Sequence, residues 1–172
     1  MEPFIDHIEI TVSLISQPLQ EVYQGSPGGI PVTIGHFYAG PPETSRTLST
    51  QREYMAAVLA LPHAALGTFS TAARGFGGET LLFSSHPELE KTHRIRGTEA
   101  ARGALNGAVL DLLSREPDWT LEGKDDKLVI HAKGSPRARG LSVEEITHFV
   151  DGVFRIAELF GARFTESSDR HT

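Results

Sequence analysis

Apolar and polar residues alternate along the first half of the chain, and a period of two predicts β-strands. Residues 8–14 read I-E-I-T-V-S-L and residues 30–34 read I-P-V-T-I, with the turn-forming stretch Q-G-S-P-G-G at 24–29 between them. Further apolar stretches at 54–59, 66–70 and 79–84 favour strands, although the alanines in the first of them also suit a helix. The first half is therefore predicted to build a sheet.

The pattern changes to a helical period in the second half. Leu105, Val109 and Leu112 recur at helical spacing after Thr98, a residue type suited to an N-cap, and predict one helix that ends near Ser114. Two short alternating stretches, 119–122 and 127–132, flank the turn sequence G-K-D-D and predict a β-hairpin.

The clearest helix is predicted to begin after Ser142, which forms a capping-box pattern with Glu145. Gly161 predicts the end of this helix, and residues 165–172 are predicted to be a frayed tail. Apolar residues at intervals of three and four predict one buried stripe, made of Val143, Ile146, Val150, Val153, Ala157 and Phe160.

These elements predict one α+β domain over residues 1–164, with a mainly antiparallel sheet covered on one face by two principal helices. The chain has 172 residues, of which 39% are hydrophobic and 22% are charged. This length and composition are sufficient to form a buried hydrophobic core.

The charge balance narrows the class of function. The chain carries 16 basic and 22 acidic residues, a net charge of −6, so it lacks the basic excess typical of proteins that bind nucleic acid or anionic lipid. It has no cysteine, which excludes disulfides, thiolate metal sites and cysteine nucleophiles. No stretch approaches the roughly 20 apolar residues of a membrane span, and the acidic start is unlike a signal peptide. We therefore expect a soluble, cytoplasmic protein.

The stretch S-S-H-P-E-L-E-K-T-H-R-I-R-G at 84–97 concentrates the residue types that acid–base chemistry needs. Its candidate catalytic residues are His86, Glu88 and His93. The H-x-E triplet of zinc deaminases requires cysteines downstream, and two histidines seven residues apart on a helix lie about 10 Å apart, too far for one ion. The structural alternative is a short helix with Pro87 in its first turn.

Three other histidines, His36, His63 and His131, are candidate metal ligands only if folding brings them together, and neither a metal nor a cofactor is expected. His36 has the same parity as the apolar residues of its strand and is predicted to turn towards the core. His131 has the opposite parity to Leu128 and Ile130, so it is predicted to lie on the exposed side of the sheet.

The last predicted helix carries more apolar surface than a single stripe requires. Phe149 and Phe154 lie towards opposite flanks of the stripe and are candidates for binding a partner protein or a second copy of the chain. The alternative is a helix that is buried deep in the core.

Several of these stretches resemble an uncharacterised family of bacterial proteins whose soluble α+β domains often follow membrane helices. The resemblance rests on G-G-I-P-V-T-I-G, on L-L-F-S-S-H-P-E-L-E-K-T-H-R-I-R-G, and on D-W-T-L-E with K-L-V-I-H, within residues 25–160. It implies no catalytic residues. The order of strands, helix, strands and helix is also similar to that of acidic secretion chaperones, a likeness of fold only.

The leading interpretation is a non-enzymatic binding or accessory module of unknown ligand, with the C-terminal helix as the candidate dimer interface. The alternative is a metal-dependent or acid–base hydrolase that uses the cluster around His86 and Glu88. A shared cleft of histidines would favour the enzyme.

Overall fold

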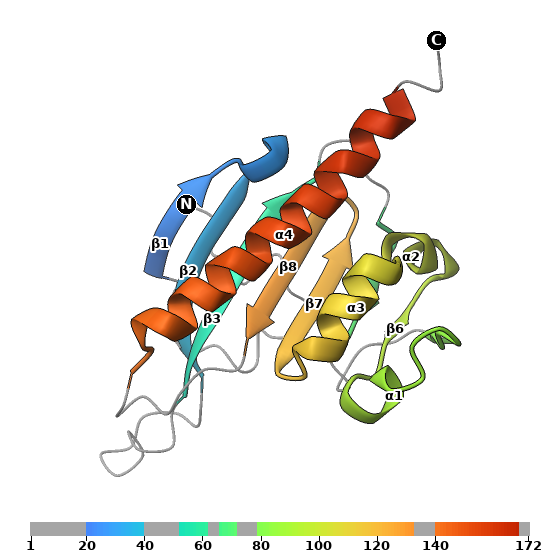
Figure 1. Ribbon diagram of the computed structural model, residues 1–172, viewed down its shortest axis with the longest axis horizontal. Coiled ribbons are helices and arrows are strands. Elements are labelled where there is room, and N and C mark those ends of the chain that lie inside the picture. The colour runs from blue at the N-terminus through green and yellow to red at the C-terminus, as the bar shows by residue number, and fades with distance from the viewer. Residues whose placement is uncertain (1–19, 40–51, 62–65, 72–78, 133–139, 169–172) are drawn as a thin grey trace.

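The structure is a computed structural model that describes residues 20–39, 52–61, 66–71, 79–132 and 140–168. Within these residues, two helices, α3 (Gly107–Arg115) and α4 (Val143–Ser168), cover one face of an eight-stranded antiparallel sheet (Figure 1). The predicted α+β fold class is confirmed. The predicted strand at 8–14 lies outside the described residues.

Some of the stretches that are predicted to be strands form long strands in the structure, and others form only short ones. The stretches at 30–34 and 54–59 correspond to β2 and β3, and the predicted hairpin is β7–β8, whereas the stretches at 66–70 and 79–84 contribute only the two-residue strands β4 and β5. The sheet order is β1-β2-β3-β8-β7-β4-β6-β5. The strands span β1 (Gln20–Gly25), β2 (Val32–Ala39), β3 (Arg52–Ala60), β4 (Phe69–Ser70), β5 (Glu79–Thr80), β6 (Arg96–Gly97), β7 (Trp119–Lys124) and β8 (Lys127–Ala132).

Cross-strand register gathers apolar side chains on the helix-covered face of the sheet. Ala57 pairs with Ile34 on one side and with Ile130 on the other, and Ile130 also pairs with Leu121. All four side chains are completely buried. Alternation along each strand places them in one row, so the alanine-rich stretch 54–59 forms a central strand because both of its edges are paired.

The single helix predicted over 98–114 is wrong, because two helices occupy that stretch. These are α2 (Glu99–Ala104) and α3, and Leu105 between them has non-helical dihedrals. The Asn106 side chain accepts a hydrogen bond from the Val109 amide at 3.1 Å and so starts a new helix. The Thr98 hydroxyl instead accepts a hydrogen bond from the Thr68 amide at 3.3 Å.

The predicted start of α4 is confirmed and its predicted end is wrong. Ser142 and Glu145 form the capping box reciprocally: the Ser142 amide donates to the Glu145 carboxylate at 2.7 Å, and the Glu145 amide donates to Ser142 Oγ at 3.1 Å. The helix passes through Gly161 and ends at Ser168, so the first half of the predicted frayed tail is helical. A glycine inside a helix costs only about 1 kcal/mol, too little to end a helix of this length.

Two glycines bring α4 close to its neighbours. A Cβ atom on Gly152 would overlap the Trp119 ring, and one on Gly28, in the 3-10 turn η2 (Pro27–Gly29), would lie 3.3 Å from the Glu158 Cα. The Trp119 ring also packs against Phe149, with 5.1 Å between ring centroids. These contacts place α4 over β7 and η2.

Gly152→Ala should destabilise the fold because the new methyl group must displace Trp119 or the helix. We expect a loss of about 1–3 kcal/mol in the free energy of unfolding, typical of overpacking, measured by urea unfolding. Gly103→Ala is the matched control, since nothing lies within 4 Å of the Cβ position there, and it should be neutral or stabilising by up to about 1 kcal/mol. Equal stability of the two variants would contradict the close contact at Gly152.

Candidate functional site

The turn before the short helix α1 (Leu89–Thr92) holds His86 against α3. His86 Nε2 lies 2.8 Å from Asp111 Oδ1, and His86 Nδ1 lies 2.8 Å from the Ser85 hydroxyl. Because a carboxylate only accepts, Nε2 carries a proton, and in a neutral ring Nδ1 would then accept from Ser85. The His86 side chain is 12% exposed and Asp111 is 58% exposed, so this chain of hydrogen bonds lies at the protein surface.

Glu88 makes a second contact with α3. The Ser114 hydroxyl donates to the Glu88 carboxylate at 2.9 Å. Two hydrogen bonds to the carboxylate lower the pKa of Glu88. The larger effect comes from the backbone amide of Glu88 itself, and the smaller comes from the Ser114 hydroxyl. Together with the His86–Asp111 contact, this bond fastens the turn to α3, and a short helix follows as the structural alternative predicted.

His93 forms its hydrogen bonds with other groups than those that His86 and Glu88 contact. It is 5% exposed, its Nε2 donates to the Trp119 carbonyl at 3.0 Å, and its Nδ1 lies 2.9 Å from the Thr92 hydroxyl. Burial lowers the pKa of His93, and the bond to Trp119 opposes that shift. His86 and His93 both line a cavity of about 290 Å³, as does Phe83, but both rings form hydrogen bonds to other groups.

The two candidate metal ligands that the structure describes, His36 and His131, are not gathered into a site. His36 pairs with Met55 across the sheet, on the helix-covered face, whereas His131 pairs with Ala56 and points to the opposite face. His63 lies outside the described residues. Within the described part of the chain, no group of three or more histidine or acidic side chains is placed to hold a metal ion.

His131 lies on the face opposite the helices, as its parity predicted, but its ring is more enclosed than that prediction implied. Its Nε2 atom is inaccessible and has no hydrogen-bond partner among the described residues, and burial lowers the pKa of His131 to about 4. On the same face, Ser70 donates to the Glu122 carboxylate at 3.3 Å, and burial raises the pKa of Glu122.

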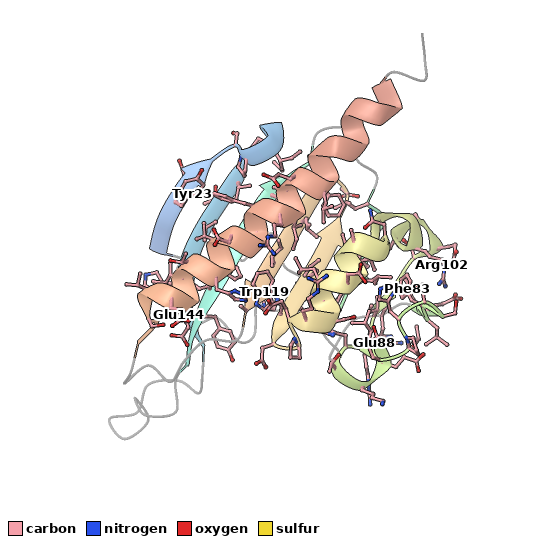
Figure 2. All side chains as sticks on the ribbon, viewed as in Figure 1. Tyr23, Phe83, Glu88, Arg102, Trp119 and Glu144 are labelled. Atoms are coloured by element: carbon pink, nitrogen blue, oxygen red, sulfur yellow. The ribbon has the colours of Figure 1, made fainter. Side chains whose placement is uncertain are left out.

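A groove lies on the helical layer between α3 and α4, and we call it the helix groove. Its volume is about 570 Å³, within the range of ligand sites in proteins. Trp119 forms part of its floor and lies between the two helices in Figure 2, whereas Glu88 lies on the other side of α3. The groove is lined by Ala108, Leu112, Arg115, Glu116, Trp119, His148, Asp151, Gly152, Arg155, Glu158 and Leu159.

Small residues keep the helix groove open. Ala108 on α3 and Gly152 on α4 present almost no side chain to it, while Leu112 and Leu159 supply apolar walls. One end is bridged by His148, whose Nε2 lies 2.8 Å from the Glu116 carboxylate and whose ring lies 6.0 Å from that of Trp119. The groove therefore combines apolar walls with charged side chains along both helices.

The two predicted partner-binding rings are turned towards neighbouring elements. Phe149 is 2% exposed and packs against Trp119. Phe154 is half-buried, and its ring centroid lies 5.3 Å from that of Tyr23. Their role in binding a partner stays a prediction, and a partner that used Phe149 would have to displace it from Trp119.

Comparison with protein-family models, with curated proteins and with solved structures found no match to this chain. The resemblances noted from the sequence therefore stay predictions. Among the described helices, none combines the length and apolar content needed to cross a bilayer.

Stability should fall in acid because of the buried histidines. A histidine in an unfolded chain has a pKa near 6.5, so between that value and about 4 the unfolded state binds a proton that folded His131 does not. The free energy of unfolding then decreases as pH falls, by at most about 1.4 kcal/mol per pH unit per histidine. Urea unfolding of wild type and His131→Asn from about pH 7 to pH 5 tests this: the variant should show a flatter dependence, and parallel profiles would contradict it.

Proposed function

We propose that this chain is a non-enzymatic binding module that holds a short segment of a partner protein in the helix groove. The observation that carries the proposal is the groove itself, an opening of about 570 Å³ between two helices that has apolar walls, charged side chains and Trp119 in its floor. Ligand sites combine such apolar linings with a few polar groups at the edge. Groove binding between helices is also a recurring mode of peptide recognition.

The surroundings of His86 favour this proposal over an enzyme. Both ring nitrogens of His86 are engaged, and Glu88 is bonded to Ser114. These contacts connect a turn to α3, which is what a structural clasp requires. The helix groove, by contrast, leaves its apolar walls without a covering element among the described residues.

Ala108→Leu should block the groove, because Ala108 is exposed on its wall and a larger side chain there would fill it. Peptides without tryptophan, selected by phage display on the wild-type chain, would be titrated while the emission of Trp119, the single tryptophan, is followed. We expect the affinity of a selected peptide to fall at least about tenfold in the variant, since filling the groove removes its apolar contact area.

Gly103→Leu is the matched control, since it adds a leucine at an exposed position of α2 that does not line the groove. It should bind the selected peptide as wild type does. Equal binding by the Ala108→Leu protein would refute the groove as the site. A dimer in solution that Ala108→Leu converts to monomer would identify the occupant as a second copy instead.

A second candidate function is supported by one observation, the chain of hydrogen bonds from Ser85 through His86 to Asp111. It has the connectivity of a nucleophile, a base and an orienting carboxylate. An acid–base hydrolase would use Ser85 Oγ as nucleophile and His86 Nδ1 as base, beside the 290 Å³ cavity that His86 lines.

A fluorophosphonate probe tests this second candidate, because it labels serines whose hydroxyl is activated by a base. For the hydrolase we expect mass spectrometry to find the label on Ser85, and to find at least about tenfold less of it in His86→Gln, as removal of a general base costs 10²–10⁴-fold in rate. Ser114→Ala is the control, since Ser114 bonds to Glu88 and not to His86. An unlabelled Ser85 in the wild-type protein rules the hydrolase out.

A further inference from the structure

The charged side chains that line the helix groove differ in whether they have partners. His148 and Glu116 are bonded to each other at one end. Four others, Arg115 on α3 and Asp151, Arg155 and Glu158 on α4, make no ion pair with any residue in the described ranges, although they line the same groove. These four groups are free to meet a ligand.

The four free charges are balanced, with two guanidinium groups and two carboxylates. A purely anionic segment would be attracted by the two arginines but repelled by Asp151 and Glu158. A purely cationic segment would be attracted by these two carboxylates but repelled by the two arginines. Like charges brought together in this way disfavour binding and provide selectivity. A segment with one charge of each sign avoids both penalties.

The helix groove also offers apolar surface beside these charges, supplied by Leu112, Leu159 and Trp119. Small residues on both helices, Ala108 and Gly152, leave room there for a side chain of the ligand. An aliphatic side chain placed in this space would remove apolar surface from water on both sides of the contact.

We infer that the segment held by the helix groove carries an apolar side chain between an acidic and a basic residue. The inference rests on the proposed function, because it concerns the occupant of the same groove. The acidic residue meets Arg115 or Arg155, whose planar guanidinium groups match a carboxylate. The basic residue meets Asp151 or Glu158.

Two blocked tetrapeptides provide the probe. The first has two leucines between an aspartate and a lysine, and the second replaces these end residues by asparagine and glutamine, so the two differ in charge and hardly in size. Trp119 emission is followed during titration at low ionic strength. We expect the charged peptide to bind more tightly, by up to about fivefold for each ion pair that it gains, and this advantage to shrink in about 1 M salt.

Arg155→Gln should reduce the preference for the charged peptide and leave the affinity for the neutral one unchanged. Arg94→Gln is the matched control, because Arg94 is also exposed but lines the 290 Å³ cavity beside His86 and not the helix groove. If the neutral peptide binds wild type as tightly as the charged one, the inference about charge is overturned and the proposed function stands. If Trp119 emission responds to neither tetrapeptide nor to the peptides selected by display, the proposed function is overturned with it.

Discussion

The arrangement of the helical layer depends on the contact between Gly152 and Trp119. Because position 152 has no side chain, α4 can lie against the indole ring, and the ring in turn packs against Phe149. The same absence of a side chain leaves space between α4 and α3, where Ala108 has only a methyl group. One packing constraint therefore fixes the helix over β7 and leaves the helix groove open beside it. Protein interiors are packed so densely that one additional methyl group at such a contact lowers the stability of the fold.

Much of the sheet could be predicted from residue periodicity, and the errors have local causes. The β7–β8 hairpin and the capping box of α4 carry short-range signals, which is why they were predicted correctly. The split between α2 and α3 also had a local signal, Asn106 followed by Gly107, which the longer apolar period of Leu105, Val109 and Leu112 obscured. Gly161 predicts a helix end because glycine favours that position, yet α4 continues through it.

The candidate sites were harder to predict because they depend on contacts between distant residues. Sequence reasoning identified His86 and Glu88, but their partners Asp111 and Ser114 lie about 25 residues further on, and no spacing rule connects them. The helix groove was missed for the same reason, since its walls come from separate helices and its floor from a strand. Parity assigned His131 to the correct face, but it could not indicate that its ring nitrogen would be enclosed.

The position of the β7–β8 hairpin has a consequence for how the chain assembles. In the sheet, β8 lies beside β3, and β7 lies beside β4, so this hairpin joins the strands that precede it into one sheet. Strands β1, β2 and β3 can pair with one another as soon as they are synthesised. The second edge of β3, however, stays unpaired until β8, which ends at Ala132, has been synthesised. Such an edge is a site for mispairing during synthesis. Pairing between strands far apart in sequence tends to slow folding, and the β7–β8 hairpin is the element that covers this edge of β3.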